Sequence, residues 1–131
     1  MKYMYKGLFL TKESEKLLHN RGKLLIKKAK NLHITFQYGS VDLFPSEMME
    51  KIFTVRIIGE GKSKKNHGYL VELPEELTPY YPSSKKPYIT VSLGKEAKSF
   101  RTGELEFSPI KPFEVEGKLG YFTNEGTVSF Q

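Results

Sequence analysis

A histidine and a threonine share one face of a short predicted strand, residues 32–36. Successive side chains of a strand point to opposite faces, so His33 and Thr35 lie side by side. The other face carries only apolar side chains and is expected to be core (Leu32, Ile34 and Phe36). An imidazole exchanges protons near neutral pH, because its unperturbed pKa is about 6.5. A hydroxyl beside it can hydrogen-bond a phosphate oxygen.

A second predicted strand, residues 88–93, repeats this arrangement. Tyr88, Thr90 and Ser92 are expected on one face and aliphatic side chains on the other. Either strand alone is a weak signal, because a half-exposed strand histidine is usually structural. Placed next to each other, the two strands would form a cleft with matched hydroxyls.

The order of these segments resembles the two-histidine phosphoesterases, and most closely the cyclic phosphodiesterase domain of fungal tRNA ligases and its small viral and bacterial relatives. The resemblance covers most of the chain. It rests on YKGLFL at 5–10, HITF at 33–36 with Gly39, VRIIG at 55–59, YLVELP at 69–74 and PYITVS at 87–92. It implies an α+β fold, a two-lobed antiparallel-sheet cradle with few short helices, in which each lobe carries one His-x-Thr/Ser motif.

In that family the paired histidines act as general base and general acid on a phosphodiester, often a 2′,3′-cyclic phosphate, and no metal or other cofactor is needed. By position, His33 and Thr35 match the first motif and Thr90 matches the hydroxyl of the second. Tyr88 stands where the second histidine is expected. The resemblance therefore implies His33 as base, Tyr88 as acid or phosphate ligand, and the two threonines as phosphate clamps.

Tyr88 leaves the chemistry open. A phenol of pKa about 10 is protonated at neutral pH, so it can donate a proton but is a poor base. Each general acid or base contributes roughly 10²–10⁴ in rate. The chain is thus either a 2H-type phosphodiesterase or a catalytically weakened module that binds nucleotides or RNA ends. A domain in which Tyr88 merely packs, with a structural or interaction role, is a third hypothesis.

Basic and aromatic residues flank the proposed cleft. The chain has 21 Lys and Arg against 15 Asp and Glu, a net charge of +6. Eight of the 21 basic residues lie next to the two motifs in sequence, at positions 27, 28, 30, 85, 86, 95, 98 and 101. Such a rim would attract a polyanion. Candidate substrate-binding residues are Ser92, Lys86, Tyr5, Ser99 and Arg101, with Tyr5 and Tyr38 able to stack on a base.

The other two histidines are weaker candidates. His67 follows a lysine-rich turn and is expected as a solvated histidine, with the alternative that it reaches the cleft from a neighbouring strand. His19, near the end of a predicted helix capped by Thr11, is expected to be structural. Three scattered histidines without cysteine give no metal-site spacing, so no metal is expected.

The length of 131 residues predicts a single domain, residues 1–131. Strands are expected at 3–10, 32–38, 52–58, 67–73, 88–93, 104–110, 113–121 and 127–130. Gly59 and a charged turn with Gly61 should end the third strand. The apolar runs are too short to span a bilayer and the first residues do not read as a signal peptide, so we expect a cytoplasmic, monomeric protein with a nucleotide or RNA partner and no membrane.

Overall fold

The computed structural model describes residues 2–39 and 42–130. In these residues the fold is α+β, dominated by an antiparallel sheet of eight strands with few helices. In chain order the elements are β1 (Tyr3–Leu10), α1 (Lys12–His19), β2 (Lys27–Lys28), β3 (His33–Tyr38), η1 (Ser46–Met48), β4 (Phe53–Lys62), β5 (Asn66–Glu72), η2 (Thr78–Tyr80), β6 (Tyr88–Leu93), η3 (Ser99–Glu104), β7 (Ser108–Thr123) and β8 (Val128–Ser129), where η marks a 3₁₀-helix.

The helix α1 forms where its capping residues predict it. The Thr11 side chain accepts a hydrogen bond from the backbone N–H of Ser14 at 3.2 Å, which satisfies a free donor of the first turn. Leu18 is fully buried, whereas Leu17 is 46% exposed. The helix therefore packs on the sheet through a narrow apolar face, and it contacts β1 and β7.

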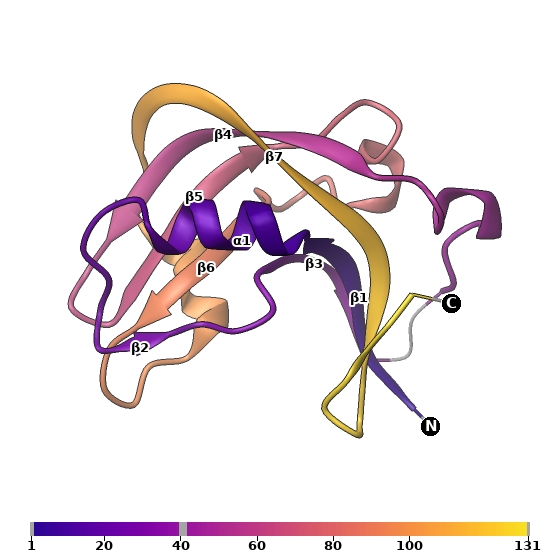
Figure 1. Cartoon of the computed structure of the whole chain (residues 1–131), viewed down its shortest axis with the longest axis horizontal. Coiled ribbons are helices and arrows are strands. Elements are labelled where there is room, and N and C mark those ends of the chain that lie inside the picture. The colour runs from indigo at the N-terminus through magenta and orange to yellow at the C-terminus, as the bar shows by residue number, and fades with distance from the viewer. Residues whose placement is uncertain (1, 40–41, 131) are drawn as a thin grey trace.

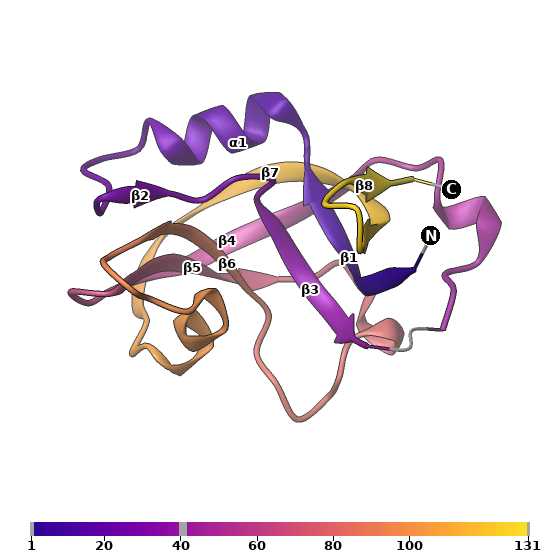
Figure 2. The ribbon, with the colours of Figure 1, turned by 90° about the horizontal axis from the view of Figure 1, so that it is seen from below.

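The sheet is strongly curved, and its curvature positions the candidate site. The strand order is β2-β6-β5-β4-β7-β1-β3, with β8 paired to β7. Figure 1 shows β7 as a long strand that bends across the molecule. Four strands separate β6 from β3 in the order, yet β3 returns to lie close to β6; the region is seen from below in Figure 2. The two strands with polar faces are thus neighbours in space although they are not paired in the sheet.

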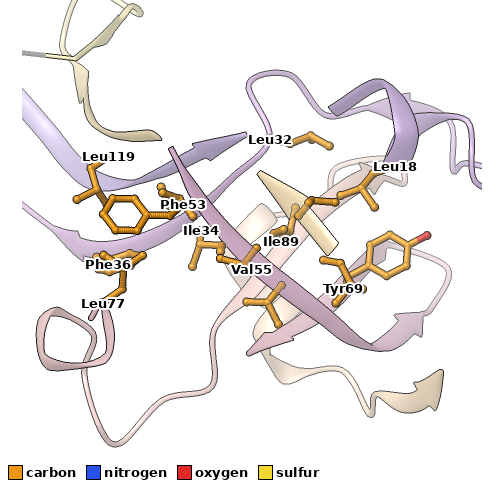
Figure 3. Close-up of a cluster of buried hydrophobic side chains, with 14 of the residues drawn as sticks. Leu18, Leu32, Ile34, Phe36, Phe53, Val55, Tyr69, Leu77, Ile89 and Leu119 are labelled. Atoms are coloured by element: carbon orange, nitrogen blue, oxygen red, sulfur yellow. The ribbon is translucent and has the colours of Figure 1, made fainter. Parts of the chain in front are cut away.

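The apolar faces of these two strands meet in the core. Ile34 and Ile89 are fully buried, and Figure 3 draws both in one cluster of apolar side chains. Leu32 and Phe36 are buried as well, with exposed fractions of 1% and 2%. The prediction that this face of residues 32–36 is core is therefore confirmed. Burying one face fixes which face of each strand looks outward.

Strand β4 runs past its predicted end. It continues through Gly59 and Gly61 to Lys62, so the prediction of a turn at these glycines is wrong. Residues 105–108 pass close to the strand at this point. A Cβ atom on Gly61 would lie 3.0 Å from the Cβ of Leu105, and one on Gly59 would lie 3.3 Å from the carbonyl oxygen of Ser108. The glycines here permit close packing rather than a turn.

Strand β7 is continuous where two strands were predicted. Its pairing with β4 moves from Phe113 opposite Ile57 to Pro109 opposite Gly59. Residues 110–112 therefore form a bulge in β7, and this irregularity accommodates the proline at 112. The prolines bend the strand instead of ending it. In the described ranges no helix combines the length and the apolar character that crossing a bilayer would require.

Candidate functional site

A cavity of about 360 Å³ lies where β3 approaches β6. The four residues of the two predicted motifs line it, His33 and Thr35 from β3 and Tyr88 and Thr90 from β6. Ser99, at the start of η3, lines it as well. The fold thus brings together five of the residues that the sequence singled out.

His33 is oriented by a backbone carbonyl and two aromatic rings. Its Nδ1 lies 2.7 Å from the carbonyl oxygen of Asn31. Because a carbonyl only accepts, Nδ1 carries the proton of the neutral ring and Nε2 presents a lone pair. The ring lies beside those of Tyr5 and Phe9, at centroid distances of 4.9 Å and 5.2 Å. Tyr5 therefore supports the histidine from behind and is not among the residues that line the cavity.

Burial sets the protonation of His33. It lowers the pKa of the imidazole below its ordinary value of 6.5, and the hydrogen bond to Asn31 raises the pKa by a smaller amount. The imidazole is consequently neutral at pH 7. Asn31 has a backbone φ of 50°, a left-handed conformation that asparagine adopts more readily than most residues. This backbone turn supplies the carbonyl that fixes the tautomer of His33.

The hydroxyl of Thr35 is available to a ligand. It lines the cavity, and it makes no hydrogen bond to any residue in the described part of the chain. It lies two residues from His33 on the same face of β3, as predicted.

Tyr88 lines the same cavity, but its proton is already in use. Its hydroxyl donates to the carbonyl oxygen of Phe100 at 3.1 Å. Burial, with smaller contributions from Tyr38, Tyr81 and Glu104, raises the pKa of Tyr88 to about 12. The phenol is therefore protonated at neutral pH and must leave Phe100 before it can donate to a ligand. The ring also fits tightly, since a Cβ atom on Gly103 would lie 2.7 Å from Tyr88 Cε1.

Thr90 belongs to a chain of internal hydrogen bonds. Its Oγ1 lies 3.0 Å from the carbonyl oxygen of Ser99 and 2.8 Å from Oγ1 of Thr102. Thr102 is fully buried, and its Oγ1 also accepts from Nδ2 of Asn66 at 3.0 Å. Thr90 is the donor in both of its bonds, so its single hydroxyl proton is shared between the Ser99 carbonyl and Oγ1 of Thr102. Unlike Thr35, Thr90 faces the cavity with its proton already bonded.

Ser92 does not lie on the face shared by Tyr88 and Thr90, so the predicted alternation is wrong at this position. In the pairing of β5 with β6, His67 lies opposite Ser92 and Gly68 opposite Thr90. One extra residue of β6 is accommodated between them as a bulge, which inverts the later side chains. Leu93 consequently lines the cavity, and Ser92 is fully buried.

The buried Ser92 forms part of a polar cluster. Its Oγ accepts from the backbone N–H of Leu25 at 3.0 Å and lies 3.3 Å from Nδ1 of His67. Nε2 of His67 lies 2.8 Å from Oε2 of Glu60, and the other carboxylate oxygen, Oε1, lies 3.4 Å from the Arg21 guanidinium. His67 is 1% exposed, so the expectation of a solvated histidine is wrong.

His19 has a structural role, as predicted. Its Nε2 donates to the carbonyl oxygen of Ala29 at 2.9 Å. This bond ties residues 27–30, which form one wall of the cavity, to the end of α1. The sequence reveals neither this bond nor the cluster around Ser92, because each joins residues from separate segments.

Three exposed lysines stand on that wall. Lys27, Lys28 and Lys30 line the cavity, and none of the ion pairs found in the described residues involves them. Lysine side chains of this kind attract an anionic ligand.

Two further predicted binding residues lie elsewhere. Lys86 lines a second, adjoining cavity, together with Ser99. Arg101 lines neither cavity; it pairs with Glu104 at 3.1 Å. Phe100 also lines the second cavity, although the sequence pattern did not single it out. The available signal was an aromatic residue directly after Ser99.

Within residues 2–39 and 42–130, no three His, Cys, Asp or Glu side chains gather in a way that could hold a metal ion. The arrangement consists of a neutral imidazole with a free Nε2, a free hydroxyl, a protonated phenol and lysines. It can accept a proton and hold an anion. No model of a known protein family matches the sequence, and a search of curated proteins finds no similar one.

Proposed function

We propose that the chain is a phosphodiesterase of the two-histidine type that acts, without a metal ion, on 2′,3′-cyclic phosphate RNA ends or cyclic (oligo)nucleotides. The observation that carries the proposal is the single lysine-flanked cavity that holds His33, Thr35, Tyr88 and Thr90. The two-lobed cradle of that family is part of the proposal. An open cavity between these residues also argues against a purely structural role.

In the proposed reaction, Nε2 of His33 takes a proton from the attacking water as the new P–O bond forms. The hydroxyl of Thr35 donates to a non-bridging phosphate oxygen. As the bond from phosphorus to the leaving oxygen breaks, Tyr88 gives that oxygen its proton after turning away from Phe100. The tyrosinate then recovers a proton from the solvent, and the His33 imidazolium releases its proton to the solvent. The turn gives up one neutral hydrogen bond, at a cost of about 1 kcal/mol.

A binding module is the second candidate, and a specific observation favours it. The hydroxyl protons of Tyr88 and Thr90 are both bonded to backbone carbonyls, of Phe100 and Ser99. If neither bond opens, the second strand supplies no acid. The chain would then hold a phosphodiester without cleaving it.

The test is turnover of 2′,3′-cyclic nucleotides, cyclic oligonucleotides and short RNAs, with and without a metal chelator. We expect turnover in both conditions, and His33→Gln should lower kcat by roughly 10²–10⁴. Lys51→Ala, an exposed site that lines neither cavity, is the control. Turnover that His33→Gln leaves unchanged would refute the catalytic role.

A second variant separates the enzyme from the binding module. If the native site is a weakened enzyme, Tyr88→His should raise the rate by orders of magnitude. A fall in rate would instead assign Tyr88 its own catalytic or binding role. Calorimetric binding of the same ligands without turnover would support the binding module.

A further inference from the structure

A second cavity of about 790 Å³ adjoins the first. The two share Tyr38, Tyr88 and Ser99 as lining residues, so Tyr88 and Ser99 stand at the boundary between them. A ligand longer than one phosphate and its sugar can therefore extend from the first cavity into the second. Both volumes fall in the range usual for small-molecule sites.

The second cavity presents aromatic rings that the core does not use. Phe100 is 52% exposed and Tyr38 is 56% exposed, and both line it. Exposed rings of this size provide stacking surfaces for nucleobases. The backbone of Phe100 is fixed, because its carbonyl oxygen accepts the hydroxyl of Tyr88 at 3.1 Å. A hydrogen bond thus links Phe100, which provides part of the aromatic surface, to Tyr88 at the boundary of the two cavities.

The same cavity carries positive charge and no acidic lining residue. Lys85 and Lys86 line it, both are exposed, and neither takes part in the ion pairs of the described residues. Backbone hydrogen bonds hold the loop that bears them: the N–H of Lys85 donates to Pro82 at 3.1 Å, and the carbonyl of Lys86 accepts from the hydroxyl of Tyr81 at 3.2 Å. Aromatic faces beside lysines on a held loop suit a ligand with a base and a phosphate.

We infer that the second cavity binds a further nucleotide, so the ligand of this protein is an oligonucleotide of at least two residues and not a mononucleotide. This inference rests on the proposed function, because the first cavity then holds the reacting phosphate. The neighbouring base stacks on Phe100 and its phosphate lies near Lys86.

The test compares two ligands that differ by one nucleotide, adenosine 2′,3′-cyclic phosphate and the dinucleotide ApA ending in a 2′,3′-cyclic phosphate. Calorimetry is done on the His33→Gln background, so that neither ligand is consumed. We expect the dinucleotide to bind roughly 5- to 100-fold more tightly, the gain of one stacked base. Phe100→Ala should remove most of that gain, and Lys86→Ala should reduce it more at low salt than at high salt.

Two exposed positions that line neither cavity provide matched controls, Ile52→Ala for the apolar change and Lys51→Ala for the charge change. Both should leave the two affinities unchanged. A linear ApA without the cyclic end and the cyclic dinucleotide of adenosine show which form of oligonucleotide is preferred.

The possible outcomes distinguish failure of the second nucleotide site from failure of the proposed phosphodiesterase function. Equal affinity for the two cyclic-phosphate ligands, with turnover by the unmodified protein, overturns the second nucleotide site and leaves the proposed function standing. Equal weakening of both ligands by Phe100→Ala also overturns it, because the effect then passes through Tyr88. Binding of neither ligand overturns both. A dinucleotide preference that Phe100→Ala abolishes supports the site even in the absence of turnover.

Discussion

Replacing Thr102 by valine tests whether the hydroxyl of Thr90 stabilises the folded state through its hydrogen bond with Thr102. Thr102 is fully buried, and its hydroxyl lies between Oγ1 of Thr90 and Nδ2 of Asn66, at 2.8 Å and 3.0 Å. Valine keeps the shape and removes both hydrogen bonds. Asn66 retains the Lys98 carbonyl at 2.9 Å, and Thr90 retains the Ser99 carbonyl at 3.0 Å. One N–H of the buried Asn66 amide loses its acceptor.

Two neutral hydrogen bonds contribute about 1–3 kcal/mol together. We expect Thr102→Val to lower the free energy of unfolding by that amount, which corresponds to a fall in Tm of about 4–10 °C for a chain of this size. Urea denaturation followed by circular dichroism measures the change. Thr54→Val, at an exposed position of β4, is the control and should change stability by less than about 0.5 kcal/mol.

A double-mutant cycle with Thr90→Val then isolates the bond between the two threonines. Residues in direct contact typically show coupling of about 0.5–3 kcal/mol, and one neutral hydrogen bond predicts a value near 1 kcal/mol. Additive effects of Thr102→Val and Thr90→Val would refute the network.

Three further outcomes follow from the structure. Burial lowers the pKa of His33, so the folded state binds a proton at this residue less readily than the unfolded chain does. The resulting contribution to the free energy of unfolding is complete above the unfolded pKa of about 6.5 and is lost as pH falls towards the folded pKa. In urea titrations, His33→Gln should therefore flatten the dependence of the unfolding free energy on pH between about 7.5 and 5.5. His67→Gln should lower the free energy of unfolding by about 1–3 kcal/mol in the same assay. This is less than the cost of breaking a fully buried ion pair, because the Glu60 side chain is 32% exposed. An unchanged stability would contradict the structural role of His67. Gly103→Ala should cost about 1–3 kcal/mol and shift the NMR signals of the Tyr88 ring, because the added methyl group meets that ring; unshifted signals would contradict the tight fit.

Local sequence patterns correctly predicted those elements that depend only on residues close together in the sequence. The capping of α1 by Thr11 and the alternation in residues 32–36 both depend on neighbours in sequence, and both are present in the structure. The extra residue before Ser92 could not be predicted, because a bulge depends on the register with another strand. For the same reason β2 was not predicted, since Lys27 and Lys28 have little strand propensity and form a strand only by pairing with β6.

In the candidate site, too, features set by local sequence were predicted and features set by contacts between distant segments were not. His33 and Thr35 were assigned to one face because burial of the opposite face fixes it. Hydrogen bonds that join distant segments carry no local signal, so the engagement of Thr90 by Thr102 was not foreseen. Nor does the sequence show that Lys86 lies in a neighbouring cavity, because the separation of the two cavities depends on where the Tyr88 ring sits.

The cavity wall formed by residues 27–30 has a consequence for association between molecules. Strand β6 would otherwise end the sheet with unpaired backbone groups, which invite pairing with another chain. Lys27 and Lys28 pair with Leu93 and Ser92, and the N–H of Ala29 donates to the carbonyl of Val91 at 2.9 Å. The wall therefore covers the second half of this edge and places lysines along it, a combination that opposes strand addition. The same few residues that border the cavity thus also protect the chain against aggregation through β6.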